Sequence, residues 1–201
     1  MGKLSLEKIV KNCLYGIRQS FNDYYEWSAG EWLSNAPEYL LTINIAKEIA
    51  KNKENKFLTL EDNVRNTLEV ANTQIRGKLS KNIRENGRTD IIIWWAKGTP
   101  RGIIEVKNDV WGVAKIQGDV KRIINILQKK SDIEFGIITF FIEKSYKNNL
   151  IKNTEKFITE NIFNNIEIPN NLKKTLQMEY LSEKDNLAAY SVIILFKKNH
   201  K

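Results

Sequence analysis

The sequence predicts an α/β protein with a mixed central β-sheet flanked by helices. Residues 90–96 and 102–107 are apolar runs of strand length on either side of a turn at 97–101, which is typical of a β-hairpin. A helical pattern over 113–129 separates this hairpin from a further apolar run at 135–142. A strand–helix–strand order implies a parallel crossover, so the sheet combines antiparallel and parallel pairs.

Helical patterns precede this region. The apolar residues of 4–21 recur at spacings of three and four, which predicts an amphipathic helix. Pro37 is expected to open a second helix that runs to about Lys51. Thr59 resembles an N-cap with an acid three residues later, which predicts a third helix over 59–71.

The C-terminal part predicts two helical stretches between 145 and 164, followed by a hairpin of 173–182 and 188–196. No repeat or Gly/Ser linker divides the chain, so residues 1–201 are expected to form a single domain. Its parts are an N-terminal helical segment (1–36), a core (37–142) and C-terminal helices with a hairpin (143–201).

Composition excludes several kinds of chemistry. Cys13 is the only cysteine and His200 the only histidine, so neither a disulfide nor histidine-centred catalysis is expected. No apolar run is long enough for a membrane span and no signal-peptide pattern is present, so we expect a cytoplasmic protein. The 32 basic and 24 acidic side chains give a net charge of +8, which favours a polyanionic partner such as nucleic acid.

Three charged residues interrupt the apolar hairpin: Asp90, Glu105 and Lys107. Side chains alternate along a strand, so Glu105 and Lys107 point to the same face. Whether Asp90 joins them depends on the register of the hairpin. A two-residue turn at Gly98-Thr99 would place Asp90 opposite Lys107 and diagonal to Glu105, on that same face, although Pro100 cannot donate the closing hydrogen bond of such a turn. Charges within strands this apolar are costly to bury unless they are paired or bind a metal ion.

Two carboxylates and an ammonium group on one sheet face suit phosphate chemistry. Carboxylate oxygens are ligands that Mg²⁺ prefers, and Mn²⁺ is expected to substitute. The ion stabilises charge on a phosphate, while a lysine orients water or stabilises the transition state. The alternative interpretation is a set of cross-strand ion pairs on a solvated face.

Asp90, a strand–turn–strand spacer and Glu105-Val106-Lys107 together resemble the signature of the PD-(D/E)xK superfamily of metal-dependent nucleases. Gly87-Arg88-Thr89-Asp90 is similar to the glycine-arginine lead-in of many members, with Thr89 in place of the nominal proline. The resemblance covers residues 37–142 and implies a restriction-endonuclease-like core in the order αβββαβ.

The resemblance also implies roles for individual residues. Asp90, Glu105 and the backbone carbonyl of Val106 would be metal ligands, and Lys107 the catalytic lysine. Many members add a glutamate from the helix before the core strands. Glu38 is our choice because it lies on the apolar stripe of that helix, with Glu31 and Glu48 as alternatives. An acid favoured by the helix dipole explains Glu38 equally well.

Basic residues near this motif are candidates for phosphate contacts, although a solvated surface explains them almost as well. Those before the hairpin include Arg84 and Arg88, together with Arg76, Lys78 and Lys81. Those on the following helix are Lys115, Gln117 and Lys121, the glutamine standing where several members carry a polar or basic residue. Asp119 and Arg122 are expected on a solvated helix face.

The function expected from this pattern is an Mg²⁺-dependent endonuclease that hydrolyses phosphodiester bonds, with DNA favoured, in restriction or anti-phage defence. Recognition would come from a homodimer or from a partner protein. The alternatives are a structure-selective repair or junction nuclease, a non-catalytic nucleic-acid-binding subunit that keeps the fold, and a protein-interaction inhibitor.

Overall fold

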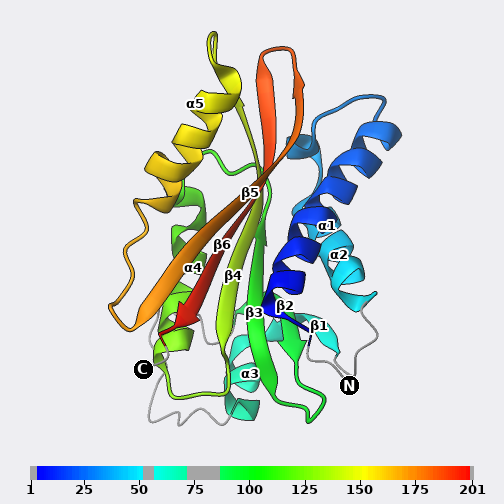
Figure 1. The fold of residues 1–201 in the computed structure, drawn as a ribbon. Helices are drawn as coiled ribbons and strands as arrows, with labels where there is room; N and C mark the ends of the chain where they lie inside the picture. The colour runs from blue at the N-terminus through cyan, green and yellow to red at the C-terminus, as the bar shows by residue number, and fades with distance from the viewer. Residues whose placement is uncertain (1–3, 52–56, 72–86, 200–201) are drawn as a thin grey trace.

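The computed structural model describes residues 4–51, 57–71 and 87–199, and their centre is one six-stranded mixed sheet (Figure 1). The strands lie in the order β1-β2-β3-β4-β6-β5. Only β3 and β4 pair in parallel, and α4 connects them as predicted. Their bounds are Leu58–Asn63 (β1), Arg88–Trp94 (β2), Pro100–Lys107 (β3), Phe135–Ser145 (β4), Leu172–Lys184 (β5) and Leu187–Lys198 (β6).

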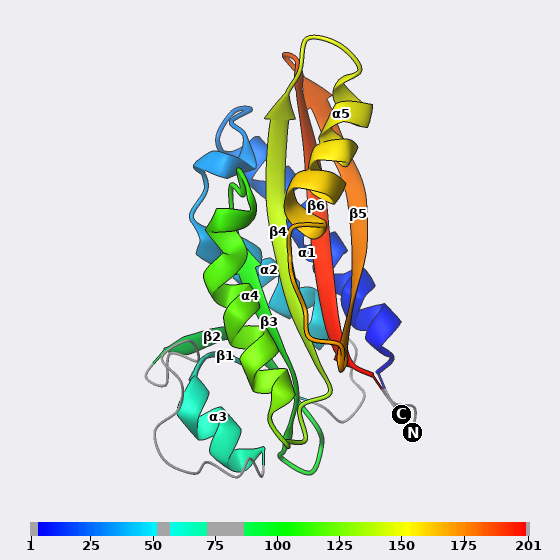
Figure 2. The same cartoon turned by 90° about the vertical axis from the view of Figure 1, so that its left-hand side faces the viewer.

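Helices cover both faces of this sheet, so the predicted α/β class is confirmed (Figure 2). One face carries α1 (Leu6–Trp27) and α2 (Glu38–Ala50), with the short 3-10 turn Leu33–Asn35 between them in the chain. The other face carries α4 (Val113–Gln128) and α5 (Leu150–Phe157), which continues into a π-helical turn at Ile158–Phe163. None of the helices in the described part of the chain has both the length and the apolar character of a membrane span.

Strand alternation divides the apolar core into two layers. Ile104 and Val106 of β3 face α1 and α2, whereas Ile103 faces α4. Glu105 and Lys107 therefore share the α4 face with Ile103. This alternation decides which helix can contact the charged residues.

The prediction of a third helix over 59–71 is wrong for the first half of that range. Residues Leu58–Asn63 form the edge strand β1, and α3 begins only at Val64 and ends at Val70. The four-residue spacing of Leu60, Val64 and Leu68 misled the prediction because Leu60 also fits a strand. Pairing with β2 satisfies the backbone groups of β1 that face β2, and the Asn63 side chain caps α3 by accepting from Asn66 N at 3.2 Å.

The predicted hairpin is present, but its two-residue turn is wrong. Ile91 pairs with Ile104, which places Asp90 across from Glu105 rather than Lys107. Pro100 has no N–H with which to close a tight turn, and closure moves to Trp95, whose N–H donates to Thr99 O at 2.8 Å. Gly98 takes the left-handed conformation (φ 81°) that this wider loop requires.

Beyond β4, the predicted C-terminal hairpin is confirmed and extends further than expected. Strands β5 and β6 pair antiparallel over most of their length. Asp185 and Asn186 connect them with φ values of 53° and 61°, as a two-residue type I′ turn requires.

Candidate functional site

Strands β2 and β3 bring Asp90, Glu105 and Lys107 to one cleft beneath α4. The cleft has a volume of about 430 Å³ and opens to solvent. Its charged lining comes from both strands and from α4: Arg88, Asp90, Glu105, Lys107, Lys115, Asp119 and Arg122.

Asp90 is fixed against the neighbouring strand. Its Oδ2 accepts a hydrogen bond from the backbone N–H of Val106 at 2.6 Å. Burial raises the pKa of the Asp90 carboxyl, and the Val106 N–H and Lys107 oppose that shift only in part. The carboxylate is therefore costly to ionise unless a cation approaches it.

Glu105 is the most deeply buried acid of the cleft, with 1 % of its surface exposed. Its Oε1 lies 3.3 Å from Arg122 Nη1 but makes no hydrogen bond with any described residue. Burial holds the pKa of Glu105 well above its ordinary value, although Arg122 opposes the shift. A buried carboxylate oxygen without a hydrogen bond is rare and is a candidate position for an ion or water.

Lys107 is surrounded by acceptors. Its Nζ lies 3.0 Å from Glu38 Oε1, 2.9 Å from Val106 O and 3.6 Å from Asp119 Oδ2. Burial alone lowers the pKa of Lys107, but attraction by Asp119, Glu38 and Asp90 outweighs it and the pKa is raised. The side chain is a persistent cation at neutral pH and is unsuited to act as a base.

The structure places Glu38, at the start of α2, beside Lys107. Its second oxygen accepts from the backbone N–H of Asn108 at 3.1 Å. The side-chain amide of Asn108 donates to Leu33 O at 2.7 Å and to Ala36 O at 2.8 Å. These two hydrogen bonds fix the chain before α2 to the end of β3. This explains how a residue of the opposite layer reaches Lys107, although Glu38 is not among the residues that line the cleft.

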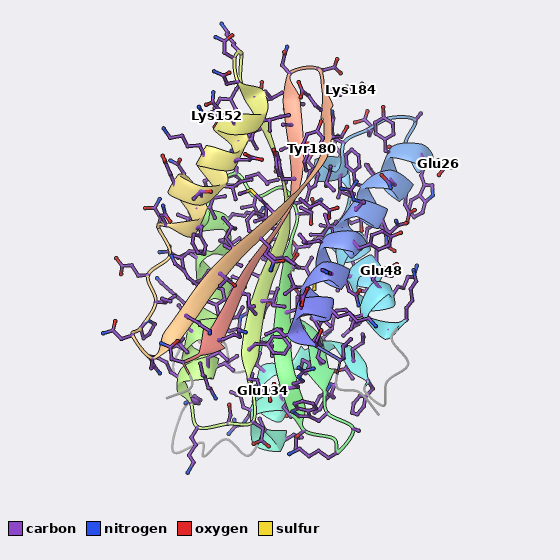
Figure 3. The ribbon with its side chains drawn as sticks, viewed as in Figure 1. Glu26, Glu48, Glu134, Lys152, Tyr180 and Lys184 are labelled. Atoms are coloured by element: carbon purple, nitrogen blue, oxygen red, sulfur yellow. The ribbon has the colours of Figure 1, made fainter. Side chains whose placement is uncertain are left out.

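The two alternatives to Glu38 have other partners. Glu31 accepts from Asn35 Nδ2 at 2.8 Å. Glu48 lies near the far end of α2, where Lys51 Nζ contacts it at 2.5 Å (Figure 3). As far as the described residues define the cleft, neither glutamate lines it.

The expectation for Asp119 and Arg122 is wrong, because both are buried in the cleft, with 7 % and 5 % of their surfaces exposed. Arg122 Nη1 donates to Arg88 O at 2.8 Å, and Nη2 contacts Asp119 Oδ1. The two positions are three apart and so share a helix face, and they follow a strand that carries two charges. That juxtaposition is a sequence signal that could have identified them.

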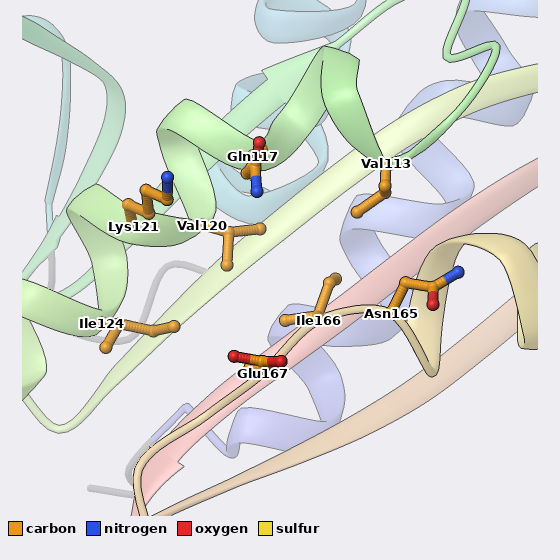
Figure 4. Close-up of a pocket in the computed structure, with 8 residues that line it drawn as sticks. All are labelled: Val113, Gln117, Val120, Lys121, Ile124, Asn165, Ile166 and Glu167. Atoms are coloured by element: carbon orange, nitrogen blue, oxygen red, sulfur yellow. The ribbon is translucent and has the colours of Figure 1, made fainter.

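The candidate nucleic-acid residues divide into two groups. Arg88 and Lys115 line the cleft. Gln117 and Lys121 instead line a separate cavity of about 300 Å³ between α4 and the segment of Ile166 and Glu167 (Figure 4). Arg84 lies outside the described residues, as do Arg76, Lys78 and Lys81.

Within the described ranges, no group of three or more acidic, histidine or cysteine side chains is arranged to hold a metal ion. The carboxylates that line the cleft are Asp90, Glu105 and Asp119. Val106 is not among the lining residues, and its carbonyl accepts from Lys107 Nζ at 2.9 Å. No protein-family model, curated protein or solved structure matches this chain. Any function assigned to the cleft must rest on its own geometry and charges.

Proposed function

We propose that this chain is an Mg²⁺-dependent nuclease of the PD-(D/E)xK type that hydrolyses phosphodiester bonds, with DNA as the favoured substrate. The observation that carries the proposal is the convergence of Asp90, Glu105 and Lys107 in one cleft, where a buried oxygen of Glu105 makes no hydrogen bond. The order α2-β1-β2-β3-α4-β4, with α3 inserted after β1, supports a restriction-endonuclease-like core.

The donor set fits a magnesium ion. Asp90 and Glu105 lie on adjacent strands and supply hard oxygen ligands, and both carboxyl pKa values are raised because burial leaves their charge poorly compensated. Together with the Val106 carbonyl they would hold the ion, and Mn²⁺ would substitute. When bound, the ion supplies a Lewis acid for the scissile phosphate and lowers the pKa of water.

The remaining groups have roles that follow from their charge. Lys107, held as a cation by Glu38 and Asp119, stabilises negative charge on the phosphate or orients the attacking water. Arg88 and Lys115, which line the cleft, contact the phosphate backbone. Sequence recognition comes from a second copy or from a partner protein, and the setting we propose is restriction or anti-phage defence.

A second candidate function has one observation in its favour. Arg122 pairs with Glu105, and Lys107 pairs with Glu38 and Asp119, so most charged residues of the cleft already have an ion-pair partner within the protein. These ion pairs are sufficient for a non-catalytic nucleic-acid-binding subunit that keeps the fold, because such a subunit does not have to bind a metal ion. It predicts binding of DNA without Mg²⁺-dependent cutting.

Cleavage assays separate the two candidates. Plasmid, linear duplex, branched DNA and RNA are incubated with the wild type, with Lys107→Ala and with Lys152→Ala, a control on α5 (Figure 3). We expect Mg²⁺-dependent cutting by the wild type and the control, and a loss of about 100-fold or more in Lys107→Ala. Equal cutting by Lys107→Ala would contradict the proposal, and preference for branched DNA would indicate a repair or junction nuclease.

A further inference from the structure

Glu61 occupies the position of β1 that lies across from Asp90. The β1–β2 register pairs Leu60 with Ile91 and Asp62 with Thr89, so the intervening residues Glu61 and Asp90 face each other across the two strands. On the other side of Asp90, the β2–β3 register leads to Glu105. Three acidic residues therefore occupy neighbouring positions across three strands, of which Asp90 and Glu105 line the cleft and Glu61 does not.

The backbone at Glu61 is strained. Its φ of 55° lies in the left-handed region, although the residue is in the middle of a strand and is not a glycine. Such a conformation costs of the order of 1–3 kcal/mol and persists only where the surrounding structure enforces it. Here Thr59 Oγ1 contacts the Asp62 carboxylate across the kink, and Trp94 Nε1 donates to Thr59 Oγ1 at 2.7 Å.

Charge connects Glu61 to the cleft. The pKa of Asp90 is raised mainly by burial, and the negative charges of Glu38 and Glu61 add to that rise. The negative charge of Glu61 acts on the Asp90 carboxyl as the smallest of these contributions. A cation near these acids would offset the repulsion between them.

Glu105 provides independent support for a ligand at this row of acids. It is 1 % exposed, lines the cleft, and presents an Oε1 that makes no hydrogen bond with any described residue. The row thus ends in a buried oxygen that has an ion-pair partner, Arg122, but no hydrogen bond, and the water of a bound cation would supply that hydrogen bond.

We infer that Glu61 is a further carboxylate of the divalent-cation site and acts on the ion through its bound water. This inference rests on the proposed function, because it takes the ion to lie at Asp90 and Glu105. The described acids do not form a direct three-carboxylate site, and Mg²⁺ usually keeps several waters, so a water-mediated role is the one that fits. Groups that support an ion in this way commonly change metal affinity by 10–100-fold.

The strained backbone makes a sharp test possible. Glu61→Gly removes the carboxylate and also relieves the left-handed strain, whereas Glu61→Gln removes the charge and keeps the strain. We expect both variants to bind Mg²⁺ about 10-fold more weakly by calorimetry. In EDTA, the thermal midpoint of Glu61→Gly should lie above that of the wild type, and that of Glu61→Gln should not rise as far.

Asn186→Gly is the matched control. Asn186 has a φ of 61° in the turn between β5 and β6, so its substitution relieves a similar backbone conformation on strands that do not carry the acids. Its Mg²⁺ affinity should equal that of the wild type. If Glu61→Gly fails to fold, Glu61→Asn removes the carboxylate with a side chain that tolerates the left-handed region.

The outcomes separate this inference from the proposed function. Unchanged Mg²⁺ affinity in the Glu61 variants, together with weakened binding in Asp90→Asn, would overturn the role of Glu61 and leave the nuclease proposal standing. Failure of the wild type to bind Mg²⁺ at all would overturn both. Weaker binding in the Glu61 variants with unchanged binding in Asn186→Gly would support the inference.

Discussion

Arg122 Nη1 lies 3.3 Å from Glu105 Oε1, and both side chains are almost completely buried between α4 and the sheet. The pair is imperfect, because Glu105 Oε1 and Arg122 Nε make no hydrogen bond with the described residues. A buried ion pair with unsatisfied atoms contributes little net stability, but losing one partner leaves an uncompensated charge. Arg122 therefore stands in the place of a cation beside Glu105.

Arg122→Ala should lower the free energy of unfolding by about 3 kcal/mol in EDTA at about pH 8. At about pH 5 the loss should be smaller, because burial raises the pKa of Glu105 and the carboxyl takes up a proton more readily. Urea unfolding at the two pH values measures the difference. Arg122→Ala combined with Glu105→Gln should recover part of the stability, and a loss that does not depend on Glu105 would contradict the role of the pair.

Mg²⁺ binding should tighten as pH rises. Burial raises the folded-state pKa of Glu105 above its ordinary value of 4.5, and it raises that of Asp90 as well. As pH climbs from the ordinary values to the raised ones, the unfolded chain releases its protons first, so the metal-free fold loses stability over this window. A bound cation requires both carboxylates to be ionised, so binding should release protons over the same window.

Calorimetry in two buffers of different ionisation enthalpy counts the released protons. Glu105→Gln should release fewer protons and bind more weakly than the wild type. A heat of binding that is the same in both buffers across this window would contradict proton release from either carboxyl on metal binding.

The contact between α1 and α2 allows a stability prediction. A Cβ on Gly16 would lie 2.5 Å from Ile45 Cα, which is backbone and cannot move alone. Gly16→Ala should therefore force the helices apart at a cost of about 1–3 kcal/mol, more than the gain of up to about 1 kcal/mol in helix propensity. Gly112→Ala is the control, because nothing lies within 4 Å of the added Cβ. Equal thermal midpoints for the two variants would contradict the close packing.

The common face of Asp90, Glu105 and Lys107 could be predicted because it depends only on strand alternation and on the parity of the hairpin register. The exact partner of Asp90 could not, because closure at Trp95 and Thr99 depends on how the chain accommodates Pro100. The local sequence pattern was therefore sufficient to predict which sheet face these residues share, but not which residue of β3 lies across from Asp90.

The parts of the cleft that sequence reasoning missed are set by tertiary contacts. Asp119 and Arg122 resemble ordinary surface charges along α4, and only the packing of that helix over β3 buries them. Glu61 was assigned to the first turn of a helix, since spacing of four residues fits Leu60 and Val64. Pairing of β1 with β2 overrides that pattern and brings Glu61 across from Asp90.

Lys115 and Lys121 offer a direct test of where nucleic acid binds. Both are exposed lysines of α4, but Lys115 lines the cleft and Lys121 lines the separate cavity beside Glu167. Lys115→Ala should weaken DNA binding at all sequences and reduce the slope of log affinity against log salt by about 1, because one phosphate contact is lost. Lys121→Ala changes the net charge equally and should leave both quantities unchanged. Fluorescence anisotropy across a salt series measures them, and equal losses in the two variants would mean that overall charge, rather than the cleft, guides DNA to this protein.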